Sequence, residues 1–317
     1  MRVIFLGTPD FAVPSLEALV ESGIEVAGVV TQPDRPAGRG GIVKPPAVKV
    51  AAHQLGLTIF QPETLRSATA VAQLRGLAPD AIVVVAYGQI LRRAVLELAP
   101  LGCLNVHASL LPWGRGASPI QAAIREGLAE TGVTVMLMNE RVDDGPILAQ
   151  RHEPILPTDT TPALSARLAP LGATLLAATL PRWQAGQIFP QPQNQAAATY
   201  CRPIRKEDGA VDWSQSAVAI ERAGRAYTPW PGCTTTWRDR QLRLGAIAAV
   251  PEWEGREPPG TVTLLPGSTT SRPILGIATG QGAVVVNALQ LAGKRPLSAA
   301  EFLRGQPSLL GSVLGER

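Results

Sequence analysis

The residues most suited to chemistry are an asparagine and a histidine two positions apart. Asn105 lies in the run Cys103–Val106, which is typical of a strand, and His107 follows this run directly. Because residues i and i+2 of a strand point to the same face, their side chains are expected to project together. An amide donor beside an imidazole suits stabilisation of an oxyanion and a proton transfer. The alternative is a hydrogen-bonded asparagine and a histidine that only caps the strand end.

A carboxylate pair follows in the stretch Val142–Gly145. This stretch connects two further predicted strands, Thr131–Met138 and Pro146–Ile155. If the loop lies at the same sheet edge, Asp143 could polarise the imidazole or accept a proton. Asp-Asp-Gly is also ordinary turn chemistry. The residue types alone therefore leave both interpretations open.

The elements that must position these groups alternate between short apolar strands and helical patterns. Runs such as Ile82–Val85 are apolar without alternation, as expected of strands covered on both faces. The pattern predicts a doubly wound, mostly parallel α/β sheet, whose ligands bind beyond the carboxyl ends of the strands. The strands are expected at Val3–Leu6, Val26–Thr31, Leu57–Phe60, Ala81–Ala86 and Cys103–Val106, and the helices at Pro14–Ser22, Ala47–Leu55, Glu63–Arg75 and Ile90–Leu98.

The last third of the chain has a different pattern. A helical stretch, Thr161–Ala185, is followed by a polar stretch with several prolines and glutamines, which reads as a linker. Short strand-like runs with frequent glycine and proline come after it and predict a small β-barrel of the oligonucleotide-binding type. We expect a catalytic domain over residues 1–188, a linker over 189–206 and a barrel domain over 207–317.

Composition and cysteine use limit the class of protein. Apolar residues make up 45% of the 317 residues and charged residues 17%, which is typical of a folded protein and excludes a long disordered chain. The apolar runs are too short for a membrane span or a signal peptide. Three cysteines lie far apart, without metal-ligand spacing, so neither disulfides nor a metal site is expected. These features predict a cytoplasmic protein.

Positive charge is concentrated in two places. A Gly/Pro-rich loop after the second strand carries Arg35, Arg39 and Lys44, and its length favours a binding role over a plain exposed loop. The net charge of +4 lies wholly in residues 200–317, where Arg238 and Arg240 stand at a predicted hairpin. A solvated surface explains this surplus as well as a polyanion partner does, although paired arginines on a barrel face suit phosphate.

The stretch after the first strand argues against a dinucleotide. Gly7–Phe11 reads G-T-P-D-F, and it lacks the two further glycines of the G-x-G-x-x-G fingerprint. A nicotinamide oxidoreductase is therefore a weaker alternative.

Taken together, these segments resemble the methionyl-tRNA formyltransferase family along essentially the whole chain. Two motifs, N-x-H…S-L-L-P at Asn105–Pro112 and D-x-G at Asp143–Gly145, are shared with other enzymes that use 10-formyltetrahydrofolate. The basic loop and the P-W-P-G motif at Pro229–Gly232 narrow the match to the tRNA enzymes. The matching segments are Gly7–Phe11, Thr31–Gly40, Val84–Gly88, Asn105–Pro112, Gly116–Gln121, Glu130–Thr134 and Lys206–Trp213.

The resemblance implies a role for each matching residue. Asn105, His107 and Asp143 would form a catalytic trio. The formyl-folate co-substrate would be lined by Tyr87, Gly88, Ser109, Leu110, Leu111 and Pro112. Initiator methionyl-tRNA would be contacted by Arg35, Arg39, Lys44, Lys206, Arg238 and Arg240, and Arg39 would enter the acceptor stem.

The resemblance also implies the reaction. The α-amino group of methionyl-tRNA would attack the formyl carbon of 10-formyltetrahydrofolate in a monomeric enzyme without a metal. Asn105 and protonated His107 would stabilise the oxyanion, while Asp143 would orient His107 and help to remove the amine proton. Two alternatives remain besides the oxidoreductase: another 10-formyltetrahydrofolate-dependent formyltransferase or hydrolase, and a noncatalytic RNA-binding protein, which would need none of the trio.

Overall fold

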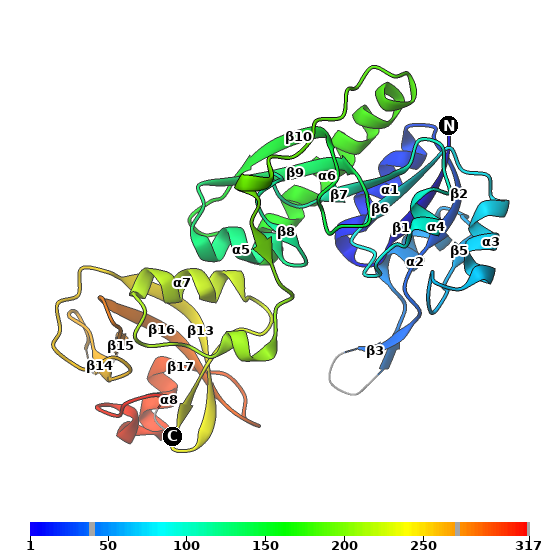
Figure 1. The fold of residues 1–317 in the computed structure, drawn as a ribbon. Helices are drawn as coiled ribbons and strands as arrows, with labels where there is room; N and C mark the ends of the chain where they lie inside the picture. The colour runs from blue at the N-terminus through cyan, green and yellow to red at the C-terminus, as the bar shows by residue number, and fades with distance from the viewer. Residues whose placement is uncertain (38–41, 270–272, 316–317) are drawn as a thin grey trace. The chain divides into compact units, whose positions relative to one another are not determined.

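The computed structural model describes residues 1–37, 42–269 and 273–315. The chain divides into two compact units, each with its own sheet. The first unit comprises Met1–Ile120, Ala129–Ile155 and Ala163–Arg202, and the second comprises Gln121–Leu128, Leu156–Pro162 and Pro203–Arg317. Figure 1 shows the strands and helices of both units.

The first unit is built on a seven-stranded sheet with the order β10-β9-β7-β6-β1-β2-β5. Five of its strands are parallel, and β9 and β10 complete one side as antiparallel strands. The strands are β1 (Arg2–Gly7), β2 (Glu25–Val30), β5 (Ile59–Phe60), β6 (Ala81–Val85), β7 (Cys103–His107), β9 (Glu130–Leu137) and β10 (Ile147–Pro154). The carboxyl ends of β1, β6 and β7 therefore meet at one sheet edge.

Helices cover this sheet, and two of its inner strands, β6 and most of β1, consist of apolar residues. All of β6 is buried, as are Val3–Leu6 of β1. This burial on both faces explains why the apolar residues of these strands do not alternate with polar ones. The helices of the first unit are α1 (Val13–Glu21), α2 (Ala47–Gln54), α3 (Ala68–Gly76), α4 (Arg93–Leu96) and α6 (Thr161–Gln184), whereas most of α5 (Pro119–Glu126) belongs to the second unit.

The helix α6 is long and apolar enough, by length and composition, to cross a membrane. Much of its apolar surface is nevertheless buried in the protein. Gly172 allows α6 to approach β7 and β9 closely, because a Cβ at this position would press against Val106 and Val133. These contacts are those of a core helix packed on a sheet.

The second unit holds a six-stranded antiparallel sheet. Its strand order is β12-β13-β16-β15-β14, and β17 pairs with β16. The β12–β13 hairpin closes at the pair formed by Trp237 and Arg240. The two residues between them, Arg238 and Asp239, have positive φ angles, which suit a tight hairpin turn. The elements are α7 (Ala217–Ala226), β12 (Cys233–Trp237), β13 (Arg240–Val250), β14 (Val262–Leu264), β15 (Leu275–Ala278), β16 (Ala283–Leu291), β17 (Leu297–Ser298) and α8 (Ala299–Gly305).

Shorter elements complete the two units. In the first, β3 (Arg35–Ala37) pairs with β4 (Ile42–Lys44), and β8 (Arg115–Gly116) pairs with β11 (Tyr200–Cys201). Within the described residues, short 3-10 helices cover Asp10–Ala12, Gln195–Ala197, Lys206–Gly209 and Pro307–Leu309.

The predicted fold class, a mostly parallel α/β sheet followed by a small β domain, is confirmed. The second domain is an antiparallel half-barrel. Two helices, α3 and α4, are shorter than predicted. The helix expected from Glu63 begins only at Ala68, because the Ser67 side chain accepts a hydrogen bond from the Ala70 amide and so caps its first turn.

Candidate active site

Asn105 and His107 lie on β7, an inner strand between β6 and β9. Only 8% of Asn105 and 7% of His107 is exposed. The strand alternation places both side chains on one face near the carboxyl end of β7, as the spacing predicts. Two polar side chains buried at a strand end need partners, since an unpaired buried polar group is costly.

Asp143, in the turn that joins β9 to β10, is a partner of both side chains. The Asn105 Nδ2 atom donates to Asp143 Oδ1 over 3.4 Å, and His107 Nδ1 lies 3.7 Å from Asp143 Oδ2. The Gly116 amide donates to Oδ2 at 2.8 Å. The structure thus brings the three predicted catalytic residues together, although Asp143 is more than thirty residues from the other two in sequence.

The histidine ring is fixed from its other side as well. His107 Nε2 lies 2.9 Å from the Gly114 carbonyl oxygen, which can only accept. Nε2 therefore carries a hydrogen, and Nδ1 is the nitrogen turned toward Asp143. This arrangement provides an imidazole oriented by a carboxylate beside an amide donor, a set that suits oxyanion stabilisation and proton transfer.

The predicted folate-lining turn Ser109–Pro112 follows directly after β7. Thr134 of β9 holds it: the Thr134 hydroxyl donates to Ser109 O at 2.6 Å and accepts from the Leu111 amide at 3.1 Å. The Ser109 hydroxyl donates to Trp113 O at 2.6 Å, so it is committed within the turn. Leu111 is buried, whereas Leu110 and Pro112 are partly exposed.

Tyr87 and Gly88 lie after β6, at the edge of a pocket of about 520 Å³. The Tyr87 side chain is 2% exposed within the core, and burial raises its pKa to about 12. Its backbone oxygen accepts from Thr8 Oγ1 at 2.9 Å. The pocket is lined also by Thr8, Pro9, Asp10, Gln32, Pro33, Arg35, Pro36, Lys44, Pro45, Pro46, Ala47 and Ala86.

Arg35 and Lys44 face each other across the β3–β4 pair. Like charges in this position are destabilising unless an anion compensates them. The neighbouring Lys49 is paired, at 2.7 Å, with Asp34, and hydrogen bonds from Gln61 and Lys49 lower the pKa of Asp34. Arg39 lies outside the described residues.

The other three predicted tRNA residues belong to the second unit. Lys206 begins a 3-10 helix and is exposed. Arg238 and Arg240 are exposed at the β12–β13 hairpin, where the Arg238 guanidinium lies 4.8 Å from the Trp237 ring centroid. Each unit therefore carries part of the predicted tRNA-binding set.

Arg115 and Gln193 were not identified from the sequence. The Arg115 side chain is buried and lies 2.9 Å from Asp144 Oδ1. Its guanidinium also donates to Gln193 Oε1, at 3.0 Å from Nε and 2.8 Å from Nη2. Gln193 falls within the polar stretch that reads as a linker, and nothing in its composition distinguishes a buried glutamine from its exposed neighbours.

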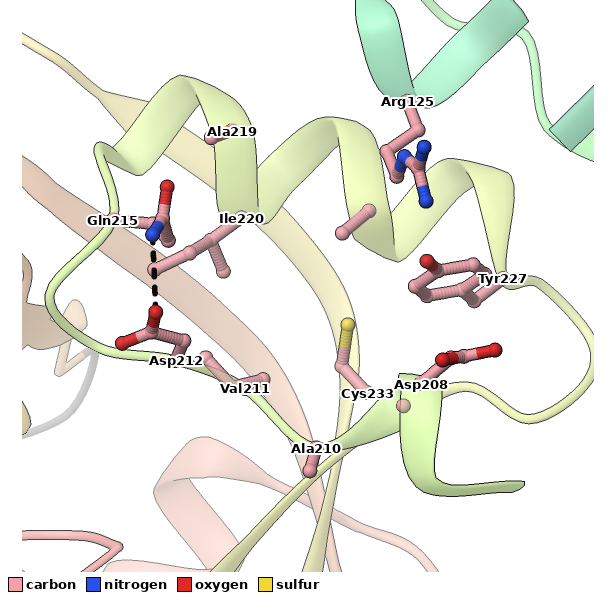
Figure 2. Close-up of a pocket in the computed structure, with 12 residues that line it drawn as sticks. Arg125, Asp208, Ala210, Val211, Asp212, Gln215, Ala219, Ile220, Tyr227 and Cys233 are labelled. Atoms are coloured by element: carbon pink, nitrogen blue, oxygen red, sulfur yellow. Dashed lines mark hydrogen bonds between the residues drawn. The ribbon is translucent and has the colours of Figure 1, made fainter. Parts of the chain in front are cut away.

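The second unit has a separate pocket of about 330 Å³ (Figure 2). A hydrogen bond with Tyr227 raises the pKa of Arg125 at its rim, and burial raises the pKa of Cys233 to about 11. Asp212 and Gln215 are hydrogen-bonded to each other at 3.0 Å. Among the residues that the structure describes, none of the predicted site residues lines this pocket.

Comparison with known proteins places the chain in a family. The profile of the formyl transferase family matches residues 1–180, and that of the formyl transferase C-terminal domain matches residues 203–307. The methionyl-tRNA formyltransferase of Roseiflexus castenholzii is 49% identical over 316 residues, which cover 99% of each chain. The chain belongs to the methionyl-tRNA formyltransferase family. Membership of this family confirms the enzyme class and excludes the oxidoreductase and the noncatalytic RNA-binding protein.

Solved structures share the fold at lower identity. HypX from Aquifex aeolicus in complex with tetrahydrofolic acid superposes with a TM-score of 0.64 at 19% identity, covering 99% of this chain and 48% of that one. An N-formyltransferase from Helicobacter canadensis, in complex with folinic acid and dTDP-3-aminofucose, has a TM-score of 0.66 at 16% identity, covering 90% of this chain and 98% of that one. The fold of this chain thus occurs in proteins solved with folates.

The residues that the structure describes contain no cluster of potential metal ligands. Over residues 1–37, 42–269 and 273–315, no group of three or more histidine, cysteine or acidic residues is arranged to hold a metal ion. Metal-independent activity stays a prediction.

Proposed function

We propose that this enzyme transfers the formyl group of 10-formyltetrahydrofolate to the α-amino group of methionine on initiator methionyl-tRNA. The amine attacks the formyl carbon, a C–N bond forms, and the carbonyl oxygen becomes an oxyanion. The bond from the formyl carbon to N10 of the folate then breaks. The proton lost by the amine is finally gained at N10, so that tetrahydrofolate and formylmethionyl-tRNA are the products.

The arrangement of Asn105, His107 and Asp143 supports this chemistry. Asn105 Nδ2 acts as a donor to the oxyanion, and a donor of this kind typically contributes about 3 kcal/mol to transition-state stabilisation. Protonated His107 stabilises the oxyanion through its positive charge, because its Nε2 hydrogen is directed at the Gly114 carbonyl oxygen. Asp143 orients the imidazole and accepts the amine proton directly or through water. The observation that carries the proposal is the approach of both Asn105 and His107 to the Asp143 carboxylate, at 3.4 and 3.7 Å.

The folate is proposed to lie along the turn after β7 and the turn after β6. The side chains of Leu110 and Pro112 are partly exposed there. Ser109 and Leu111 fix the shape of the first turn through Thr134. Tyr87 and Gly88 contribute backbone, because the Tyr87 side chain is buried in the core.

The tRNA is proposed to be held through positive charge on both units. Arg35 and Lys44 are opposed across β3–β4, and a phosphate near them would relieve their repulsion. Arg39, in the same loop, is proposed to enter the acceptor stem. Lys206, Arg238 and Arg240 provide exposed positive charge on the second unit.

The division of labour follows from this assignment. Residues 1–188 would form the formyl-folate-binding catalytic domain, 189–206 the linker and 207–317 the tRNA-binding domain. We propose that the enzyme acts as a monomer in the cytoplasm, where charged initiator tRNA is formed. Sedimentation at the assay concentration tests whether the enzyme is a monomer.

The reaction is tested directly with purified components. The enzyme is incubated with 10-formyltetrahydrofolate and initiator methionyl-tRNA, and formylmethionine is measured after deacylation. Elongator methionyl-tRNA is the control substrate. Formylation of the initiator only is expected, with no loss on addition of a chelator. Chelator-sensitive activity that zinc restores would contradict the metal-free mechanism.

A further inference from the structure

Gln193 is a buried residue within an exposed segment. It is 6% exposed, whereas Gln191, Pro192, Asn194 and Gln195 around it are exposed. Burying a glutamine amide is costly unless its donors and acceptor are all paired. In this protein they are paired, and the partners lie at the candidate active site.

The amide of Gln193 donates on one side and accepts on the other. Nε2 lies 2.8 Å from the Asp143 carbonyl oxygen and 2.7 Å from the Gly145 carbonyl oxygen. Oε1 accepts from two guanidinium nitrogens of Arg115. Because arginine has donors only, Oε1 must face Arg115, which turns Nε2 toward the two carbonyls. Arg115 therefore determines the orientation of the Gln193 amide.

The turn that Gln193 contacts contains a residue, Asp143, in an unfavourable backbone conformation. Asp143 has a φ of 48°, in the left-handed region that non-glycine residues adopt at a cost. Gln193 ties down the peptide carbonyls on both sides of Asp144, while Asp144 itself is paired with Arg115 at 2.9 Å. The position of the Asp143 carboxylate relative to His107 thus depends on the Gln193 amide.

We propose that Gln193 is a positioning residue, which holds the turn at Asp143 so that its carboxylate stays against Asn105 and His107. Gln193 acts through Asp143 and does not touch the reacting atoms. The inference rests on the proposed catalytic role of Asp143.

The sharpest test is Gln193→Glu. This change keeps the size and the acceptor toward Arg115 but places an oxygen against two carbonyl oxygens. We expect kcat to fall by up to about 100-fold, since small displacements of catalytic groups have effects of this size, with the KM for 10-formyltetrahydrofolate unchanged within about twofold. The control is Gln191→Glu, which adds the same charge two residues away on an exposed side chain, whose Nε2 donates to Phe189 O. It is expected to keep the wild-type kcat.

Repeating Gln193→Glu in an Asp143→Asn enzyme separates positioning from general stability. If Gln193 acts through Asp143, the second change costs less than about twofold in kcat per folded molecule. The same fold loss in both backgrounds, or a wild-type kcat for Gln193→Glu, would overturn the inference. If Gln193→Glu does not fold at the assay temperature, Gln193→Met replaces it in both backgrounds with the same criteria. An Asp143→Asn enzyme with normal kcat would instead refute the proposed trio itself.

Discussion

Two aspartates occupy left-handed turns in this molecule, one in each unit. Asp143 has a φ of 48° and Asp239 a φ of 59°. The Asp143 side chain is 15% exposed and contacts Asn105, His107 and the Gly116 amide, whereas Asp239 is exposed at the β12–β13 hairpin. Both positions suit aspartate, which tolerates this backbone conformation. The buried partners of Asp143, and not the turn residue itself, therefore mark the candidate site.

The largest expected difference follows from the same substitution in both turns. Asp143→Asn should lower kcat at least about 100-fold, because the neutral amide neither supports a charged His107 nor accepts a proton. Asp239→Asn should leave kcat unchanged. Turnover per folded molecule, with the folded fraction measured by circular dichroism, gives the answer. Equal losses of kcat for Asp143→Asn and Asp239→Asn would show that the buried partners of Asp143 do not mark a catalytic site.

A double change sharpens the same comparison. If His107 and Asp143 act as one unit, as proposed, His107→Ala combined with Asp143→Asn should cost far less than the product of the single losses. His107→Ala combined with Asp239→Asn should cost no more than His107→Ala alone. Multiplicative losses for the first pair would show that the two groups act independently.

The proposed oxyanion donor, Asn105, is tested next. Asn105→Ala should lower kcat about 100-fold, the usual consequence of removing one such donor, and should leave tRNA binding nearly intact. Single-turnover formylation and filter binding of tRNA measure the two quantities. A lower melting temperature with normal turnover of the folded fraction would instead favour a hydrogen-bonded asparagine without a catalytic role.

The two turns should also differ in their contribution to stability. Asp144→Ala leaves the Arg115 guanidinium buried without its counter-charge and should lower the free energy of unfolding by about 3 kcal/mol. Asp239→Ala, at an exposed position, should change it by less than about 0.5 kcal/mol. Urea unfolding followed by fluorescence compares them. Similar midpoints would mean that the Arg115–Asp144 pair is dispensable.

The smallest effect is expected from the arginines beside Asp239. Replacing Arg238 and Arg240 with alanine should weaken tRNA binding several-fold at low salt and reduce the salt slope by about one for each phosphate that these arginines neutralise. The kcat at saturating tRNA should stay at the wild-type value. An unchanged salt slope would indicate that these residues are only a solvated surface.

Much of the fold could be predicted because it depends on local patterns. The run Ile82–Val85 predicts a strand buried on both faces, and the i, i+2 spacing of Asn105 and His107 predicts a shared face. Helix ends were less predictable. The helix expected from Glu63 begins at Ala68, since a serine cap competes with helical propensity over a few residues.

The order of the elements, the shared strand face of Asn105 and His107, and the residues that resemble a formyltransferase site could all be predicted from the sequence alone. The tertiary structure was needed to reveal that Asp143 contacts Asn105, His107 and the Gly116 amide, because these partners lie on β7 and β8, far away along the chain. It alone distinguished Gln193 from the polar residues beside it. Burial and hydrogen bonding between distant segments depend on how the chain closes on itself, and a residue's type does not encode which neighbours that closure supplies.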